Sequence, residues 1–349
     1  MINKLIIIIT LFLILVFSFS CSEDVNINAD YQDIPIIYCV LDPSSEYQYV
    51  KVNKSFLGEK PAHELAQNSS LLFYNNVHIT LKNLKNNTVW TFNKVDIDKN
   101  EGTFANDQNI IYTSKIDFGN VDKDTEFELN VDIEGGKHIV TSRTKLISGG
   151  SFTQPSPMFD NVVSLTYYNG ERSYKFYAGY LTNLYQTYLK FNYFEVKGND
   201  TAYKSITIPL NKANLPVNYN NYEITQQFGI EYFYRNLKTY IPVVDGVTRY
   251  VQMPTSDKIN SFEFQLFSVD ENYNTYSQIS APSNGIVQHK PTFTNLNGAY
   301  GLFASRNVVT VLAKPNQETL DSIARGIYTK GLNFKGYEPR IDNYYYSYY

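Results

Sequence analysis

Beyond residue 33, hydrophobic and polar positions alternate along many short stretches, and this period of two predicts β-strands. Residues 77–82 alternate cleanly, turn at Asn86-Asn87 and return through residues 89–92, which predicts a hairpin. A second hairpin is predicted around the turn Glu134-Gly135-Gly136-Lys137. The strands of this second hairpin are residues 127–133 and 138–144. The other strands expected are residues 34–41, 47–52, 110–116, 162–168, 174–180, 184–196, 202–210 and 262–269.

A helical period occurs mainly in the second half of the chain. Apolar residues lie 3, 4, 7 and 11 positions after Ile230, and this spacing predicts an amphipathic helix that ends before Pro242. The residues of this apolar stripe are Ile230, Phe233, Tyr234, Leu237 and Ile241. Shorter helices are predicted at residues 61–67, from Asp270 onwards, and at residues 315–327.

These elements predict a mainly β protein of two domains. Short strands with regular turn signals over residues 34–147 predict an immunoglobulin-like or transthyretin-like β-sandwich. The strongest break in the pattern, rich in Gly, Ser and Pro, places a linker at residues 148–160. A second β-rich domain with a few short helices is predicted for residues 161–335. The tyrosine-rich tail, residues 336–349, has no interpretable pattern.

The N-terminus has the build of a secretory signal. Lys4 precedes a run, residues 5–17, that is apolar except for Thr10 and is short for a spanning helix, and Ser18 and Ser20 lead to a cysteine. The segment resembles a bacterial lipoprotein signal, in which residues 1–20 are removed and Cys21 receives a diacylglycerol. A signal anchor, or a plain signal peptide with a chance cysteine, is the alternative.

Residues 21–33 are polar and acidic and are predicted to form a tether between the lipid and the folded part. Ser22, Glu23 and Asp24 resemble the short acidic tag that directs lipoproteins of Bacteroidota to the outer surface. The resemblance implies a protein held in the outer membrane by the lipid on Cys21 and facing the cell exterior.

The composition excludes several classes of partner. A net charge of −4 with scattered lysines argues against nucleic acid and against a basic membrane-binding patch. The chain has two cysteines, so a lipid on Cys21 leaves Cys39 without a disulfide partner within one chain. Cys39 lies in a strand-like apolar run, and we interpret it as core packing rather than as a nucleophile.

No metal, cofactor or catalytic motif is predicted. Asp96, Asp98 and Asn100 have the spacing of a calcium loop, but Glu101 stands where an EF-hand needs glycine, which favours a solvated loop between strands. The histidines are too far apart for a zinc motif, and His78 and His138 alternate with apolar residues as solvent-facing strand positions would; the four are His63, His78, His138 and His289.

A carbohydrate-active site has little support in the sequence. Glu195 and Glu231 are the only guesses for a pair of catalytic carboxylates. Trp90, Tyr185 and Tyr193 could stack on sugar rings, but aromatic residues that alternate along strands are usually core residues.

A late motif carries a family resemblance. Residues 294–304, Thr-Asn-Leu-Asn-Gly-Ala-Tyr-Gly-Leu-Phe-Ala, are similar to the signature of uncharacterised Bacteroidota lipoproteins that are often encoded beside TonB-dependent receptors. The leader with the early strand, and the aromatic run in residues 262–276, resemble the same family. The signature residues are Asn295, Asn297, Gly298, Gly301 and Phe303. From the residues themselves, Gly298 and Gly301 predict a turn or a close backbone approach at the start of a final strand.

The resemblance implies a non-enzymatic, surface-exposed outer-membrane lipoprotein that serves as an accessory or ligand-binding partner of a TonB-dependent receptor. Two alternatives remain open: a structural or adhesive envelope protein, and a carbohydrate-active enzyme.

Overall fold

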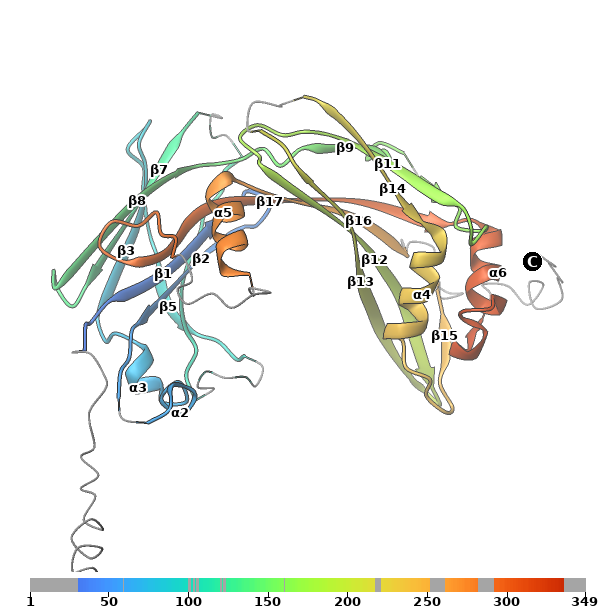
Figure 1. The fold of residues 1–349 in the computed structure, drawn as a ribbon, viewed down its shortest axis with the longest axis horizontal. Coiled ribbons are helices and arrows are strands. Elements are labelled where there is room, and N and C mark those ends of the chain that lie inside the picture. Colours follow the sequence, from blue (N-terminus) through green and yellow to red (C-terminus); the bar gives the residue numbers. More distant parts are fainter. Residues whose placement is uncertain are drawn as a thin grey trace, which may run out of the picture.

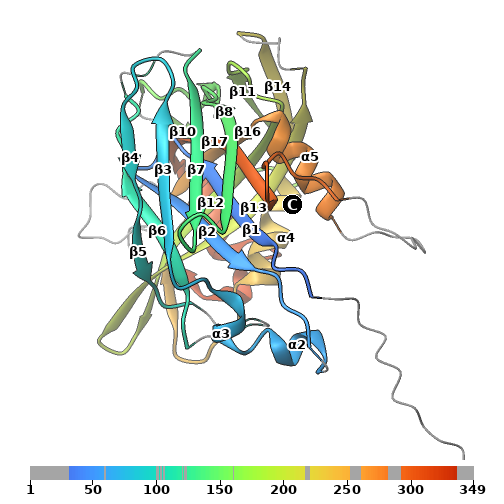
Figure 2. The same cartoon turned by 90° about the vertical axis from the view of Figure 1, so that its left-hand side faces the viewer.

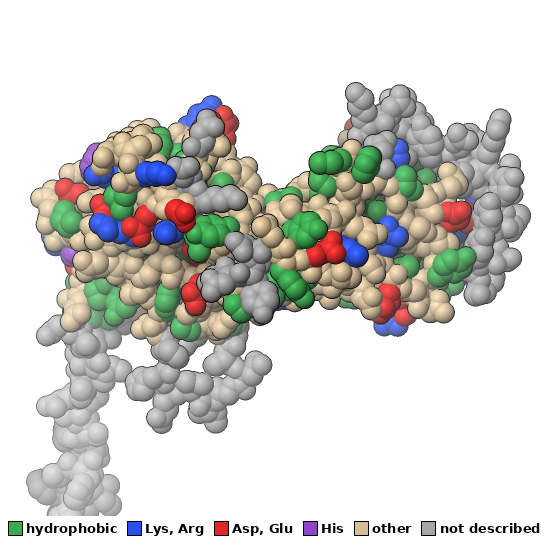
Figure 3. All heavy atoms as spheres, turned by 90° about the horizontal axis from the view of Figure 1, so that it is seen from above, with side chains coloured by type: hydrophobic (Ala, Val, Ile, Leu, Met, Phe, Trp, Pro, Cys, Tyr) green, Lys and Arg blue, Asp and Glu red, His purple; other side chains and the backbone are tan. Residues whose placement is uncertain are grey.

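The computed structural model describes residues 31–58, 60–99, 102, 104, 107–119, 121, 124–159, 161–216, 221–251, 261–281 and 292–335. The chain is mainly β, with 48% strand and 15% helix, as the alternation predicts. Figure 1 shows two lobes connected by a long strand, and Figure 3 shows the narrow waist between them. Lobe 1 contains residues 31–147 and 292–305, and lobe 2 contains residues 151–269 and 306–335.

Lobe 1 is a sandwich of two layers. One layer has the strand order β4-β3-β7-β8, and the other contains β1, β2, β6 and β5. Their bounds are β1 Pro35–Leu41, β2 Tyr47–Lys54, β3 Val77–Asn83, β4 Val89–Thr91, β5 Asn93–Asp96, β6 Ile110–Lys115, β7 Glu126–Ile133 and β8 His138–Lys145. Two one-turn helices, α2 (Ala62–Leu65) and α3 (Ser69–Leu72), follow β2. Inward-facing residues of both layers, such as Ile37 and Leu129, form one core.

Lobe 2 packs two sheets and two helices around an aromatic core. The larger sheet contains β10 (Asn161–Val163), β12 (Leu184–Lys197), β13 (Asp200–Asn214), β15 (Thr248–Tyr250), β16 (Phe262–Val269) and β18 (Phe334–Lys335). The smaller sheet has the strand order β14-β11-β9. Its strands are β14 (Glu223–Gly229), β11 (Glu171–Tyr177) and β9 (Ser151–Gln154). The helices are α4 (Ile230–Tyr240) and α6 (Gln317–Arg325), and the 3-10 helix η1 is Lys330–Leu332.

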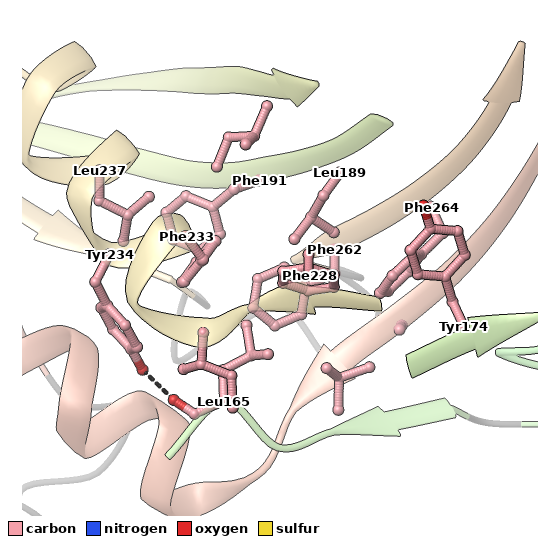
Figure 4. Packing of buried hydrophobic residues seen from close by; sticks show 14 of the residues in the cluster. Leu165, Tyr174, Leu189, Phe191, Phe228, Phe233, Tyr234, Leu237, Phe262 and Phe264 are labelled. Atoms are coloured by element: carbon pink, nitrogen blue, oxygen red, sulfur yellow. Dashed lines mark hydrogen bonds between the residues drawn. The ribbon is translucent and has the colours of Figure 1, made fainter. Parts of the chain in front are cut away.

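Rings from β12, β16 and α4 interlock in this core (Figure 4). Phe233 meets Phe191 edge-on, with ring centroids 5.7 Å apart. The hydroxyl of Tyr234 donates a 2.6 Å hydrogen bond to the carbonyl of Leu165, so this buried polar group is satisfied. The predicted apolar stripe of residues 230–241 therefore forms the buried face of α4.

The strand β17 (Tyr300–Pro315) belongs to both lobes. Residues 300–305 pair in parallel with β1, and residues 306–313 pair antiparallel with β16. One sheet of eleven strands consequently runs from β5 in lobe 1 to β18 in lobe 2. The chain returns to lobe 1 through residues 292–305, so Leu296 and Phe303 lie in the lobe 1 core although they follow almost all of lobe 2 in sequence.

Most predicted strands are present, and the exceptions are informative. Residues 61–67 form only the one-turn α2, and α3 follows separately. Only residues 162 and 163 of the predicted strand 162–168 lie in a sheet, as part of β10. The tail, residues 336–349, lies outside the described residues.

Candidate functional site

A cleft of about 360 Å³ opens where the helix α5 (Glu271–Ser280) packs beside β1 and the start of β17. We call it the tyrosine cleft. Its described lining residues are Ile36, Tyr38, Tyr276, Ile279, Ser280, Thr292, Phe293, Tyr300 and Gly301. None of them is charged, so the cleft suits a neutral, largely apolar or aromatic group.

Strand alternation and a helix cap place the side chains of this cleft. In β1, Ile37 and Cys39 face the core, which leaves Ile36 and Tyr38 on the opposite face of the sheet. On the other wall, α5 begins at Asp270, whose carboxylate accepts a 2.8 Å hydrogen bond from the amide of Tyr273. The cap fixes where α5 starts and therefore where Tyr276 projects.

Tyr38 and Tyr276 form the polar centre of the cleft. Their hydroxyl oxygens are 2.9 Å apart, and their rings meet edge-on with centroids 5.8 Å apart. Burial, together with the hydrogen bond to Tyr276, raises the pKa of Tyr38 to about 12. Both a hydrogen-bond donor and an acceptor are thus present at neutral pH, beside apolar walls.

The signature residues form a single corner behind this cleft. The side-chain amide of Asn295 donates to the carbonyl of Phe303 at 2.6 Å and accepts from the amide of Phe303 at 2.9 Å. This two-way pairing imitates one rung of a β-ladder. It satisfies the backbone of β17 on the side opposite β1.

The same corner is attached to the other sheet of lobe 1. Asn297 and Thr141 of β8 exchange backbone hydrogen bonds of 2.9 and 3.2 Å. The hydroxyl of Ser142 donates to the carbonyl of Asn295 at 2.6 Å. The corner therefore links the sheet of β8 to the sheet of β1 and closes the sandwich at this end.

Both signature glycines are required by close backbone contacts, as predicted. Gly301 has φ +124°, and a Cβ placed there would lie 1.9 Å from the carbonyl oxygen of Ile37. Gly298 has φ +87°, and its Cβ position is 2.9 Å from the carbonyl oxygen of Ile139. The signature is thus a structural corner that holds Tyr300 and Gly301 at the cleft.

A second polar cluster, the Asp33 clamp, fixes the first described residues to lobe 1. The Asp33 carboxylate accepts from the Tyr74 hydroxyl at 2.7 Å and lies 2.5 Å from the Lys137 ammonium and 3.1 Å from His138 Nε2. Burial alone would raise the pKa of Asp33. The hydrogen bonds from Lys137, Tyr74 and His138 outweigh it and hold that pKa well below its usual range.

The residues expected to carry the lipid and the export tag, Cys21, Ser22, Glu23 and Asp24, lie outside the described residues, as does His289. His63 and His78 are exposed. His138 corrects an expectation, because its side chain is only 19% exposed and packs in the Asp33 clamp instead of facing solvent. Within the described ranges, no group of three His, Cys, Asp or Glu side chains is arranged to hold a metal ion.

The two carboxylates considered for catalysis have separate structural partners. Glu195 on β12 accepts from the buried guanidinium of Arg249 at 2.7 Å, and Arg249 also donates to two backbone carbonyls. Glu231 on α4 pairs with Arg235 at 2.8 Å and accepts from Tyr328. Each carboxylate therefore joins elements of lobe 2.

The aromatic residues considered for sugar stacking pack in the cores. Tyr185 and Tyr193 are 1% and 4% exposed in the lobe 2 core. Trp90 is half-buried and packs against Phe118 and Phe127 in lobe 1. Cys39 is 1% exposed, as core packing requires.

The calcium-like run lies in the connection after β5. Asp96 and Asp98 are exposed, and Asp96 accepts a hydrogen bond from the amide of Asn109 across this connection. Asn100 lies outside the described residues.

Sequence reasoning missed the pairing of Tyr38 with Tyr276, because 238 residues separate them. The available signal was Tyr38 itself, a large aromatic on the polar side of an alternating strand. No protein-family model and no curated protein matches this chain. Among the described residues, no helix has the length and hydrophobicity needed to cross a membrane.

Proposed function

We propose that this chain is a surface-exposed outer-membrane lipoprotein and the accessory partner of a TonB-dependent receptor, a neutral group of which binds in the tyrosine cleft. The observation that carries the binding role is the cleft itself. It combines apolar walls, a hydrogen-bonded pair of tyrosine hydroxyls and an uncharged lining, which is the usual composition of a ligand site. The rigid signature corner holds one wall in place.

The leader supports the location. Tyr31, the first described residue, is ten positions after Cys21, and an extended chain spans at most about 3.6 Å per position, so the tether reaches no more than roughly 36 Å. The Asp33 clamp attaches the end of the tether to lobe 1. We propose that lobe 1 stays close to the membrane, where a membrane-embedded partner is within reach.

The cleft is tested by co-purification with the receptor. The native lipoprotein, isolated from outer membranes, is expected to carry a TonB-dependent receptor with it. Replacing Tyr38 and Tyr276 with alanine removes both hydroxyls and most of the aromatic wall, so we expect at least a ten-fold loss of the receptor. Tyr240→Ala is the matched control, because Tyr240 is 60% exposed at the end of α4. A receptor yield unchanged by the double substitution would refute the role of the cleft.

The anchor is tested separately. Cys21→Ala removes the acceptor thiol, so the protein is expected to leave the membrane fraction or to remain unprocessed. Unchanged membrane partition together with unchanged processing would refute the lipoprotein assignment.

A further inference from the structure

The two sides of β17 are occupied differently along its length. On one side, β16 covers residues 306–313. On the other side, β1 ends opposite Ser305, and β10 begins opposite Ala313. Residues 306–312 therefore have no neighbouring strand on that second side among the described residues. We call this interval the β17 gap.

Hydrogen bonds show which residues of β17 face the gap. The amide of Ser305 donates to the carboxylate of Asp270, and the carbonyl of Ser305 accepts from the amide of Asp270. Both bonds lie on the side of β17 that faces β16. Because successive residues of a strand direct their backbone groups to opposite sides, the even-numbered residues face the gap. The carbonyl of Leu312 agrees, since it accepts from Asn161 beside β10 at 3.1 Å.

The backbone groups of Val308 and Thr310 accordingly face the gap. No hydrogen bond from the described residues reaches them there. Seven residues at about 3.3 Å each give the gap a length of roughly 23 Å. Burial also falls in this part of β17, where residues 306–309 are half-buried and Thr310 and Leu312 are exposed, while Val311 stays buried.

Exposed apolar side chains lie near the gap, and a second hollow opens beside it. Met158 is 86% exposed and Phe159 is 75% exposed, and Val162 and Leu312 are each about half exposed. A pocket of about 320 Å³ lies against the same stretch of β17; its lining is Ser156, Pro157, Phe159, Asn161, Thr310, Val311 and Leu312. An unpaired strand edge beside exposed apolar side chains is the usual site for strand addition.

We propose that the β17 gap is the docking site for an extended segment of the receptor partner, which completes the sheet between β1 and β10. The proposal rests on the proposed function for the identity of the partner. Val308 and Thr310 exchange main-chain hydrogen bonds with the added strand. One uncharged side chain of that strand enters the pocket beside Phe159, because the described lining residues of the pocket carry no charge.

Amide hydrogen exchange on the mature chain tests the edge itself. The amides of Val309 and Val311 face β16 and are expected to be protected, whereas those of Val308 and Thr310 should exchange on the order of 100-fold faster. Equal protection at all four positions would overturn the proposal, since the chain would then cover its own edge.

A peptide probe tests whether binding uses the backbone. The probe is a blocked heptapeptide of alternating threonine and valine, in three forms: unmethylated, N-methylated at alternate amides, and N-methylated at consecutive central amides. Alternate methylation leaves one edge free to pair, whereas consecutive methylation blocks both edges. We expect the first two forms to protect Val308 and Thr310 and the third to fail. Equal protection by all three forms would indicate side-chain binding and would overturn the proposal.

Substitutions in the full lipoprotein connect the edge to the partner. Thr310→Pro removes an amide that faces the gap and leaves the β16 ladder intact, and Val308→Lys is a second variant that places a charge on the edge. Both should reduce receptor co-purification at least ten-fold. Val243→Lys, at a position 72% exposed after α4, should not.

The outcomes separate the two proposals. If the wild type brings down the receptor and both edge variants do so equally, strand addition is refuted and the proposed function stands. If the wild type brings down no receptor, the proposed function fails, and the exchange and peptide experiments alone decide whether the edge accepts a strand.

Discussion

At the scale of single residues, Gly301 has the sharpest structural requirement. A methyl group there would meet the carbonyl of Ile37, which β1 cannot move without breaking its parallel ladder with β17. We expect Gly301→Ala to lower the free energy of unfolding by about 3 kcal/mol. Gly246→Ala is the control, because Gly246 also has positive φ but open space around it, and about 1 kcal/mol is expected. Urea unfolding of both variants measures the difference, and equal losses would contradict the steric explanation.

Cys39 gives a second prediction at this scale. The thiol is buried in lobe 1, and burial raises its pKa, so little reactive thiolate forms at neutral pH. A thiol reagent should label Cys39 only after unfolding, and Cys39→Ala should cost about 1 kcal/mol of stability without loss of partner binding. Rapid labelling of the folded protein would contradict this interpretation.

Residues whose cause lies nearby in sequence were predictable. The strand-like run around Cys39 predicts that its side chain lies in the core. The glycines at the start of the predicted final strand predict the close backbone approach at Gly301. The Asp33 clamp was not predictable, because its members come from the tether, from the loop before β3 and from the start of β8. Such clusters depend on which strands become neighbours, and one sequence does not contain that information.

At the scale of elements, β17 remains one strand across a polar interruption in its sequence. Its apolar stretch Leu302–Ala304 is followed by the polar residues Ser305, Arg306 and Asn307 and then by a second apolar stretch. That pattern is typical of two strands separated by a turn. In the structure the strand is continuous, and the polar residues mark where it crosses the waist. Arg306 pairs there with Asp42 at 2.8 Å, and the amide of Ile147 donates to the hydroxyl of Ser305.

The start of α5 yields a prediction about pH. Burial raises the pKa of Asp270 to about 6, although bonds from the amides of Tyr273 and Ser305 partly oppose this. Between about pH 4 and pH 6, the Asp270 carboxyl is therefore protonated in the folded state and deprotonated in the unfolded state. The contribution of Asp270 to stability is greatest below pH 4 and falls by about 3 kcal/mol as the pH rises through 6.

Asp270→Asn removes this titration and also the hydrogen bond from Ser305. We expect the variant to be less stable than the wild type at pH 4.5 and the difference to narrow by pH 7. Urea unfolding at the two pH values measures it. A stability difference that stays constant or widens would show that Asp270 does not titrate in this range.

At the scale of the whole molecule, the proposed surface location depends on the tether. Glu23 and Asp24 precede the Asp33 clamp in sequence, so in the proposed function we expect their charges to affect export and not the core. Replacing both with alanine should leave the protein lipidated and folded but facing the periplasm. Protease added to intact cells should then degrade the wild type and spare the variant. Equal protection of both forms would mean that the wild type already faces inward.

The division into lobes was only partly accessible from sequence. The Gly and Ser signals at residues 148–150 fall in the passage from β8 to β9, where the chain leaves lobe 1, but residues 151–154 of the predicted linker form β9 itself. The return of residues 292–305 to lobe 1 left no such signal. The pairing of β17 with β1 and the bridge from Asn297 to Thr141 place those residues in lobe 1.

This return makes lobe 1 dependent on the distal part of the chain. Residues 31–147 alone lack Leu296 and Phe303, two core side chains whose burial is worth about 1.5–3 kcal/mol each. They also leave one edge of β1 unpaired, and the total stability of a domain is only about 5–15 kcal/mol. We therefore expect the fragment 31–147 to be unfolded or aggregated, in spite of its complete β1–β8 sequence.

A fusion provides the matched comparison. Residues 292–305 attached to the same fragment through a flexible Gly/Ser linker should restore the strand beside β1 and the corner around Asn295. Circular dichroism and urea unfolding should then show one cooperative transition that the fragment alone lacks. If residues 31–147 unfold cooperatively without the added strand, lobe 1 is an autonomous domain, and β17 connects two finished lobes instead of completing the first.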